Sequence, residues 1–382
     1  MNEIEKTYVN VDNFYSRLNE YNIDFFTGVP DSLLKDFCAY ITDNTSKENH
    51  IIAANEGNAI AIAAGYYLGT KKIPLVYLQN SGLGNIVNPL TSLIDENVYN
   101  IPMLILIGWR GQPGRKDEPQ HISMGKNIED LLKSLDLEYK ILPDYDVGAN
   151  NCIDVAYKYM KDTNKPYVLL IPNHTFSKYK LQKQLSNNYV FSRENLLHYV
   201  MNNINNVDTL VSTTGMLSRE LYEYRINNNQ PTKDLLNVGS MGHCSSIALG
   251  LSLTNKKKKV IVLDGDGSVL MHMGCIGING CNAGSNFKHI IFNNGVHDSV
   301  GGQDTEGFNI NFQKIASGCN YKIVECNDYN KEEEVNKSIK NLLEMEGPVL
   351  LELRCKPGAR SNLGRPEKFK NMKETFYNKW TN

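Results

Sequence analysis

The sequence predicts an α/β protein built from two doubly wound parallel-sheet domains. Short apolar runs rich in β-branched residues alternate with helix-length segments along the whole chain. Several runs are apolar on both faces, which is typical of strands that helices cover on each side. Such alternation favours parallel strands joined by right-handed crossovers. Because 382 residues are enough for two domains, and six candidate strands lie on each side of a polar stretch, we expect two sheets.

The candidate elements follow one another along the chain without a long gap. The strands expected in the first half are Ile23–Thr27, Ile51–Asn55, Leu75–Gln79, Met103–Ile107, Tyr139–Leu142 and Tyr167–Ile171. Those expected in the second half are Thr209–Ser212, Leu235–Val238, Val260–Leu263, His289–Phe292, Tyr321–Val324 and Val349–Leu353. Helical patterns between them include Asn58–Leu68, Ile128–Leu135, Ala149–Met160, Ser245–Leu253 and Glu332–Glu344.

The boundary between the domains is predicted in a polar stretch, 175–193, that has no apolar periodicity. Ser192 or Asn195 could cap the first helix that follows it. The expected organisation is a first domain over 1–180, a linker over 181–194, a second domain over 195–355 and a C-terminal arm over 356–382. The arm contains two prolines and two glycines before residue 367, so we expect it to be extended.

Composition excludes several classes of function. A formal net charge of −2 provides no general field for nucleic acid or for an anionic membrane. No apolar run reaches the roughly 18–20 residues that span a bilayer, and residues 1–8 lack a secretory apolar core. Eight cysteines occur singly, without metal-ligand spacing. We therefore expect a cytoplasmic protein with reduced thiols that binds neither nucleic acid nor membrane.

One strand end carries the strongest chemical signal. The apolar run Val260–Leu263 leads into Asp264-Gly-Asp-Gly267, and a helix is expected from Ser268. Glycines let the backbone turn tightly and let a ligand approach it. Ligands of open parallel sheets bind outside the carboxyl ends of the strands, and a helix N-terminus suits a phosphate group. Asp266 would therefore present its carboxylate beside a phosphate.

The next strand ends in a second polar group, Asn293-Asn-Gly295. The separation from Asp266 to Asn294 is 294 − 266 = 28 residues, the length of one helix-plus-strand excursion. Oxygens from Asp266, Asn294 and the Val296 carbonyl would then converge on Mg²⁺ bound to a diphosphate. A tight turn with a capping Asp remains the alternative. A dinucleotide or Walker-type site is excluded, because neither glycine pattern is present.

The pair GDGS and NN, on successive strands, resembles the signature of thiamine diphosphate-dependent enzymes. The resemblance implies the thiamine diphosphate-binding fold, with a pyrimidine-binding and a diphosphate-binding domain and no middle domain. It implies thiamine diphosphate and Mg²⁺ as cofactors, with Met241 as the wedge under the two cofactor rings. The cofactor-binding residues that it implies in the second domain are Thr214, Gly215, Gly239, Ser240, Met241, Gly265, Asp266, Gly267, Ser268, Asn294 and Val296.

The first half supplies the carboxylate that such enzymes need near N1′ of the aminopyrimidine. The segment Ala53–Tyr67 resembles the family's glutamate motif, which makes Glu56 a cofactor-binding and catalytic residue. Glu56 stands before a helix so rich in Ala and Gly that another element should pack closely on it. From the residues alone, Glu56 could equally be a helix N-terminal acid that complements the dipole.

Several further blocks resemble the thiamine diphosphate-dependent decarboxylases of phosphonopyruvate, and next those of sulfopyruvate. The blocks are Gly28–Lys35, Ala54–Asn58, Gln79–Asn85, Gly108–Gly111, Lys116–His121, Gly239–Gly242, His297–Gln303 and Pro357–Pro366. They imply decarboxylation of phosphonopyruvate to phosphonoacetaldehyde and CO₂ in phosphonate biosynthesis. Sulfopyruvate decarboxylation, a carboligase and a non-catalytic cofactor-binding subunit are the alternatives. The family also implies a homo-oligomer, at least a dimer, with shared active sites.

The expected substrate carries two anionic groups, so its pocket needs cations. The loop after Ile107 supplies Arg110, Arg115, Lys116 and His121, and the arginine fork suits a phosphonate. A solvated basic loop is the alternative. Asp31 or Ser32 should face the substrate, although Asp31 could instead cap a helix. Besides Glu56, the expected catalytic residues are Asp31, His121 and His297. The expected substrate-binding residues are Ser32, Arg110, Arg115, His121, His243 and Gln303.

Overall fold

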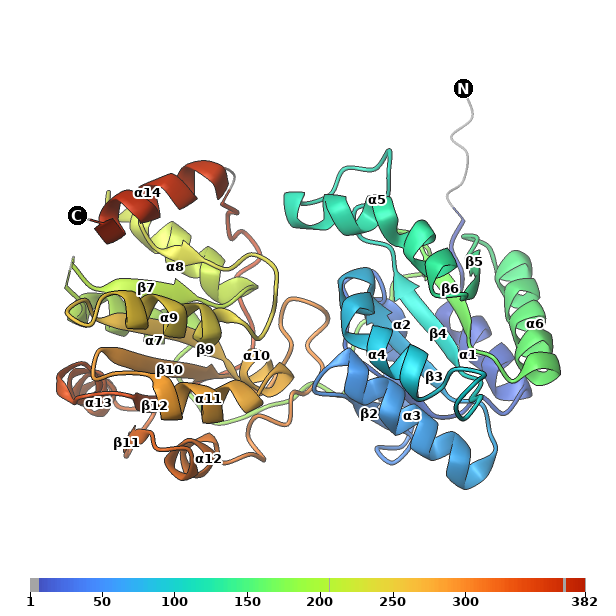
Figure 1. Ribbon diagram of the computed structural model, residues 1–382, viewed down its shortest axis with the longest axis horizontal. Helices are drawn as coiled ribbons and strands as arrows, with labels where there is room; N and C mark the ends of the chain where they lie inside the picture. The colour runs from blue at the N-terminus through green and yellow to red at the C-terminus, as the bar shows by residue number, and fades with distance from the viewer. Residues whose placement is uncertain (1–6, 206, 367–368, 382) are drawn as a thin grey trace. The chain divides into compact units, whose positions relative to one another are not determined.

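The computed structural model describes residues 7–205, 207–366 and 369–381. The chain divides into two compact units between Gln184 and Leu185, a point inside the predicted linker. Each unit holds one six-stranded sheet in which all strand pairs are parallel (Figure 1). The predicted α/β class with two parallel sheets is therefore confirmed.

The sheet of the first unit has the strand order β2-β1-β3-β4-β6-β5. Its strands are β1 (Phe26–Gly28), β2 (His50–Ile52), β3 (Leu75–Gln79), β4 (Leu104–Gly108), β5 (Glu138–Ile141) and β6 (Tyr167–Ile171). All residues of β4 and β6 are buried. Successive side chains of a strand point to opposite faces, so Leu75 and Tyr77 enter one core while Val76 and Leu78 enter the other.

Helices cover both faces of this sheet. The first core contains apolar residues of α1 (Val11–Glu20), α2 (Lys35–Asn44) and α6 (Asp146–Thr163). The second contains those of α3 (Glu56–Thr70), α4 (Leu83–Ser92) and α5 (Pro119–Ser134). A short 3₁₀ turn, η1 (Asn80–Gly82), joins β3 to α4. The helices of the second core thus begin at the loops that carry the predicted site.

The sheet of the second unit has the same kind of order, β11-β12-β10-β9-β7-β8. Its strands are β7 (Thr209–Ser212), β8 (Leu235–Leu236), β9 (Val260–Gly265), β10 (Phe287–Asn293), β11 (Lys322–Val324) and β12 (Val349–Arg354). One face packs against α7 (Arg193–Asn203), α8 (Met216–Asn227) and α13 (Glu332–Glu344). The other packs against α9 (Cys244–Thr254), α10 (Asp266–Met271), α11 (Gly274–Asn282) and α12 (Phe312–Gly318).

The first helix of the second unit begins with a capping box. The Ser192 side chain accepts the backbone N–H of Asn195, and the Asn195 side chain accepts the N–H of Ser192. Two backbone donors at the start of α7 are satisfied in this way. Of the two predicted caps, Ser192 therefore occupies the N-cap position and Asn195 assists it.

The expectation of an extended arm over 356–382 is wrong for its second part. Residues 357–366 contain no helix or strand, but α14 (Phe369–Thr381) is helical. Lys258 Nζ donates to the carbonyl groups of Lys379 and Trp380 at 2.9 and 2.8 Å, which satisfies acceptors at the end of α14. The prolines and glycines all precede residue 367, so nothing in the later sequence opposes a helix.

In the described ranges, no helix combines the length and the apolarity that a bilayer span requires.

Candidate functional site

In the first unit, polar side chains collect at the carboxyl ends of four strands that are neighbours in the sheet. Asp31 follows β1, Glu56 follows β2, Asn80 follows β3 and Arg110 follows β4. The carboxyl ends of neighbouring parallel strands lie next to one another, so these loops gather at the same end of the sheet. The structure therefore brings the predicted Asp31, Ser32, Glu56 and Arg110 to one edge.

Glu56 is the first residue of α3 and only 5% exposed. The amide group of Asn85 donates to its Oε2 at 2.7 Å. A methyl group added at Gly82 would lie 2.3 Å from Oε1, so Gly82 must be glycine for the carboxylate to fit. The Asn55 side chain caps α3 by accepting the Asn58 N–H. Glu56 is consequently not needed as the cap and is held by α4 and η1.

Asn85 and Gly82 had no role in the sequence prediction, although both lie in the block Gln79–Asn85. The signal that could have found them is their place directly after a buried strand, β3, next to β1 in the sheet. The predicted close packing on α3 does occur at Gly57, where an added methyl group would lie 2.9 Å from the Asn85 carbonyl oxygen.

Asp31 is fully buried, and its Oδ2 accepts the Leu33 N–H at 2.9 Å. Its Oδ1 has no hydrogen-bond partner among the described residues. Burial raises the pKa of the Asp31 carboxyl to about 6, although the N–H of Leu33 and the charge of Arg110 act in the opposite direction. No side chain caps α2, which begins at Lys35. The alternative that Asp31 caps this helix is thus not observed.

Arg110 is held by other residues of its own unit. It forms a two-fold ion pair with Asp117, in which Nε donates to Oδ2 at 2.9 Å. A further nitrogen, Nη1, donates to the Ser32 hydroxyl at 2.8 Å. Burial alone would raise the pKa of the Asp117 carboxyl, but hydrogen bonds from Arg110 and Gly111 bring it below its usual range. Arg110 therefore orders the Ser32 loop, and its charge is balanced by Asp117.

The remaining residues of the predicted basic loop differ in their surroundings. Arg115 is exposed and donates to the Asn173 carbonyl at 2.9 Å, and Lys116 is also exposed. His121 does not lie in a loop, because α5 begins at Pro119, earlier than the helix predicted from Ile128. Proline is favoured in the first turn of a helix, a signal that could have placed this start.

In the second unit, the two predicted halves of the clamp do meet. Asp266 begins α10, not Ser268 as predicted, and is 2% exposed. The Thr305 hydroxyl donates to its Oδ2. Desolvation raises the pKa of the Asp266 carboxyl to about 6, whereas hydrogen bonds from Thr305 and from the Asn294 backbone N–H act to lower it. The Asn294 backbone N–H thus lies near enough to the Asp266 carboxylate to affect its pKa, although a helix and a strand separate the two residues in sequence.

Asn294 is 3% exposed, and its Oδ1 accepts a hydrogen bond from the backbone N–H of Val296 at 3.3 Å. Gly295 between them has a φ of +73°, a conformation that glycine adopts without strain. The three predicted metal ligands, Asp266, Asn294 and Val296, accordingly belong to one buried cluster. Their oxygens are of the hard kind that Mg²⁺ prefers.

A serine joins three loops around this cluster. The Ser268 hydroxyl accepts a hydrogen bond from the Thr213 hydroxyl at 2.8 Å and from the Gly242 N–H at 3.2 Å. Through it, the ends of β7, β8 and β9 are tied together. The neighbouring candidate residues of these loops are partly or fully exposed, namely Thr214, Gly215, Gly239, Ser240 and Met241.

The three polar residues predicted to follow the cofactor motifs lie in different environments. The His297 ring lies against Gly267, where an added methyl group would be 2.8 Å from it. Burial lowers the pKa of His297 to about 4, so its imidazole is neutral near pH 7. Gln303 is 1% exposed, and neither polar atom of its side chain has a partner in the described chain. His243 is exposed and contacts the His272 ring.

These features fit a bound diphosphate and metal. Asp266 is a buried carboxylate without a cationic partner among the described residues, an arrangement that costs free energy unless a cation joins it. Gln303 offers buried polar atoms that have no protein partner. A methyl group added at Gly265 would meet only the Thr213 side chain, at 3.9 Å, so the backbone beside Asp266 is open at this position. Oxygen ligands, unsatisfied polar atoms and open backbone occur together at this one edge.

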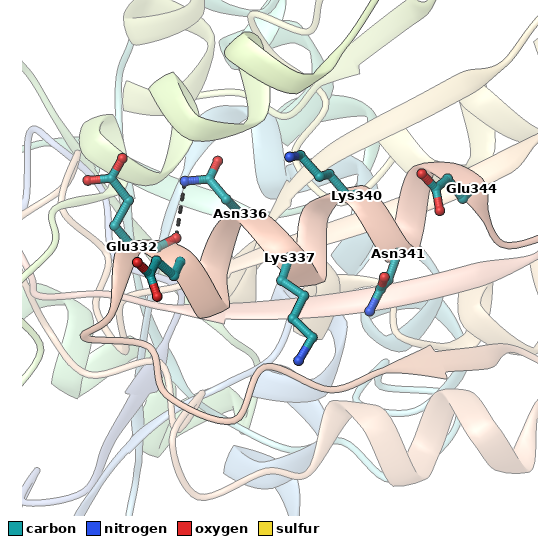
Figure 2. Close-up of a pocket in the computed structure, with 7 residues that line it drawn as sticks. Glu332, Asn336, Lys337, Lys340, Asn341 and Glu344 are labelled. Atoms are coloured by element: carbon teal, nitrogen blue, oxygen red, sulfur yellow. Dashed lines mark hydrogen bonds between the residues drawn. The ribbon is translucent and has the colours of Figure 1, made fainter.

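A surface depression elsewhere in the second unit is a poor alternative site. It follows the outer face of α13 and is open to solvent (Figure 2). Its lining consists of Glu332, Glu333, Asn336, Lys337, Lys340, Asn341 and Glu344. These charged and amide side chains come from one helix, as expected of a solvated face, and none of them is a predicted site residue.

Comparisons with known proteins match both units. The N-terminal TPP binding domain of thiamine pyrophosphate enzymes matches 11–134, and the C-terminal TPP binding domain matches 213–353. A phosphonopyruvate decarboxylase of Streptomyces hygroscopicus is 33% identical, covering 89% of this chain and 86% of the relative. One of Streptomyces viridochromogenes is 32% identical, covering 86% of each. A sulfopyruvate decarboxylase of Methanosarcina acetivorans is 26% identical, covering 94% of this chain and 95% of the relative.

Proposed function

Because the chain belongs to the thiamine pyrophosphate (thiamine diphosphate) enzymes, we propose that it decarboxylates 3-phosphonopyruvate to phosphonoacetaldehyde and CO₂. The family resemblance expected from the GDG and NN motifs is confirmed by both domain matches. The chain is a thiamine diphosphate-dependent decarboxylase. The observation that carries the choice of phosphonopyruvate is the similarity of nearly the whole chain to two decarboxylases of that substrate.

In this proposal, the second unit holds the diphosphate end of the cofactor through Mg²⁺. Asp266, Asn294 and the Val296 carbonyl are the metal ligands. The residues that would contact the diphosphate are Gly265, Gly267, Ser268, Thr214 and Gly215. Gly239, Ser240 and Met241 support the cofactor rings. The buried cluster around Asp266 supports this assignment, because no cationic side chain of the described residues pairs with its carboxylate.

Glu56 is proposed to hold a proton at N1′ of the aminopyrimidine. When bound, thiamine diphosphate supplies the electron sink that accepts the electron pair left by departing CO₂. Glu56 would give a proton to N1′ of the aminopyrimidine or take one from it, and this proton transfer is general acid–base catalysis. The Asn85 amide and the tight fit of Gly82 support this role, because they fix the carboxylate in one position.

Substrate recognition is proposed for the remaining predicted residues. Asp31, with a pKa raised to about 6, can give or accept a proton near pH 7, and His121 is a further candidate for this task. His297 is neutral at that pH, so it is proposed to orient the reacting groups through hydrogen bonds. The residues proposed to bind the substrate are Ser32, Arg110, Arg115, His121, His243 and Gln303. Arg115 suits the phosphonate better than Arg110, because Asp117 already balances the charge of Arg110.

We further propose a homo-oligomer, at least a dimer, in which Glu56 of one copy and the metal cluster of another act on one cofactor. Family resemblance supports this arrangement. A cytoplasmic location is proposed as well. All eight cysteines lie in the described part of the chain and none forms a disulfide, which supports a reducing compartment.

The choice of substrate is tested by comparing kcat/KM for phosphonopyruvate and sulfopyruvate with the same preparation, loaded with thiamine diphosphate and Mg²⁺. We expect phosphonopyruvate to be preferred. A preference for sulfopyruvate would favour the function of the Methanosarcina acetivorans relative, which also covers almost the whole chain. Condensation products that form faster than free aldehyde would identify a carboligase.

Replacing Gly82 with alanine is expected to lower kcat although no polar group changes. The added methyl group would lie 2.3 Å from Glu56 Oε1, so the carboxylate has to move. A misplacement of about 1 Å in an active site can cost on the order of 100-fold in rate. Gly84→Ala is the matched control, because its methyl group would meet nothing within 4 Å. Equal kcat values for the two variants, measured in the decarboxylation assay, would contradict this role of Gly82.

Replacing Asp31 with asparagine is expected to change how stability depends on pH. The folded-state pKa of about 6 lies above the ordinary value of 3.8, so the folded wild type loses stability as pH rises through this interval. Asparagine removes that loss. The variant should therefore gain about 3 kcal/mol relative to wild type between pH 3.5 and pH 7. Urea denaturation at several pH values measures the free energy of unfolding of both proteins. If this free energy depended on pH in the same way for the variant and the wild type, the raised pKa would be contradicted.

A further inference from the structure

Asn294 has a partner that fixes the orientation of its side-chain amide. Its Nδ2 donates to Asp298 Oδ2 at 2.7 Å. An amide has a donor end and an acceptor end, so a carboxylate on the donor side leaves only the oxygen for the opposite side. A rotated Asn294 would place its Nδ2 where a metal needs an oxygen, and it would bring two oxygens together at Asp298.

Asp298 is itself held in place from two directions. Arg193 Nη1 donates to its Oδ2 at 2.7 Å, and the backbone N–H of Gly358 donates to its Oδ1 at 2.9 Å. Both carboxylate oxygens are therefore engaged, and the side chain is only 10% exposed. Asp298 cannot turn away from Asn294 without breaking these bonds.

The arginine that holds Asp298 is buried and rigid. Arg193 is 7% exposed, and its Nε and Nη2 each donate to one oxygen of Glu220 at 2.9 Å. Such two-fold pairs fix the plane of the guanidinium group. Arg193 begins α7 and Glu220 lies in α8. The orientation of Asn294 therefore depends on two helices that pack on one face of the sheet.

The segment after β12 completes this arrangement. Besides the bond from Gly358 to Asp298, the Arg360 guanidinium pairs with Glu194 at 2.9 Å and also with Glu223. The Gly364 N–H donates to Glu223 as well. The block Pro357–Pro366 resembles the family, but no role was predicted for it from sequence. In the structure it is bound to the start of α7 and the middle of α8.

We propose that Asp298, fixed by Arg193 and Gly358, is a positioning residue that makes Asn294 present its oxygen to the metal. The inference rests on the proposed function, since it concerns the same metal cluster. It adds three residues, Asp298, Arg193 and Glu220, that act on the metal through Asn294. Partners of this kind around a metal ligand typically contribute about 10–100-fold to metal affinity.

A purely structural ion pair is the competing explanation, and the second unit offers a matched control. Arg225 pairs with Asp234 through Nε at 2.8 Å and Nη2 at 3.0 Å, and both side chains are buried. Among the described residues, Asp234 forms no hydrogen bond or ion pair with the metal cluster. Removing either aspartate leaves a buried arginine short of one carboxylate, which should lower thermal stability in both cases.

The test is calorimetric titration of Mg²⁺ into the full-length protein in saturating thiamine diphosphate. Asp298→Ala is expected to raise the Kd for Mg²⁺ by about 10–100-fold, whereas Asp234→Ala should leave it within about three-fold of wild type. Asp298→Asn keeps an acceptor oxygen for the Asn294 amide, so its Kd should lie between those of wild type and the alanine variant. If the alanine variant does not fold, the Kd of Asp298→Asn alone tests the inference.

Three outcomes are decisive. Wild-type Kd values in the folded Asp298 variants would overturn the inference and leave the proposed function standing. Equal losses in the Asp298 and Asp234 variants would also overturn it, because the effect would then be structural. Failure of the wild type to bind Mg²⁺ with thiamine diphosphate would instead overturn the proposed metal site, and the inference with it.

Discussion

Replacing Glu56 with glutamine is expected to lower kcat by about 10²–10⁴-fold, the range typical of lost general acid–base catalysis. Glutamine has the same shape and can still accept the Asn85 amide hydrogen bond at 2.7 Å. It cannot hold or release a proton at N1′ as a carboxylate does. The affinity for thiamine diphosphate should therefore change little. Steady-state assays give kcat, and titration of the cofactor gives its affinity.

A buried carboxylate of another helix in the same unit provides the control for this variant. Asp36 lies in the first turn of α2, is 8% exposed and accepts the Tyr179 N–H at 3.1 Å. Asp36→Asn should affect stability and leave kcat close to wild type. A Glu56→Gln enzyme with wild-type kcat would refute the assigned role. It would also revive the alternative that Glu56 only complements the dipole of α3.

Replacing Asp266 with asparagine is expected to weaken the binding of Mg²⁺ by at least about 100-fold, since a direct ligand should exceed the effect of its outer partners. Thiamine diphosphate affinity should fall with it, because the proposed Mg²⁺ would link the diphosphate to the protein. Without cofactor, the melting temperature of the variant should be no lower than that of wild type. The reason is that desolvation disfavours the charge of Asp266 in the folded protein.

These opposite effects distinguish a metal ligand from a structural acid. Calorimetric titration measures Mg²⁺ binding, and thermal denaturation without cofactor measures the stability of the protein alone. Lys288, on β10 of the same unit, provides a control, because its Nζ donates to backbone carbonyl groups outside the metal cluster. Lys288→Met should lower stability and leave Mg²⁺ affinity unchanged. An Asp266 variant that binds Mg²⁺ like wild type would contradict the assignment.

Much of the fold follows from local sequence. The strands β3, β6 and β7 have the predicted bounds, because each contains a short apolar run of strand length. β10 begins two residues before the predicted His289. Lys288 concealed this start, since a lysine in a buried strand is unexpected. Its Nζ reaches the carbonyl groups of Ser285 and Met345, so its charged end is satisfied while the strand continues.

The composition of the site was less accessible from sequence than the fold. The motifs placed Glu56, Asp266 and Asn294 at or shortly after the carboxyl ends of strands, where the structure also has them, although β2 ends at Ile52 and not at the predicted Asn55. Their partners are set by tertiary packing, which sequence spacing does not reveal. Asn85 is 29 residues from Glu56. Arg193 lies 105 residues before Asp298 and still holds it.

The basic loop shows the same limit. Its composition predicted several cations for an anionic substrate, but these side chains differ in their contacts. Arg110 is paired with Asp117, only seven residues later, and with Ser32, which lies 78 residues earlier. Arg115 remains exposed. Sequence alone could not tell which of the two arginines keeps its charge available, because that depends on which carboxylate the folded loop brings near.

The most direct test of decarboxylation is a ³¹P NMR time course of phosphonopyruvate with the wild-type protein. One sample contains Mg²⁺ and thiamine diphosphate, and a second lacks thiamine diphosphate. We expect the phosphonopyruvate resonance to be replaced by that of phosphonoacetaldehyde in the first sample only. An unchanged phosphonopyruvate resonance in the complete sample, with cofactor binding demonstrated by titration, would contradict the proposed function.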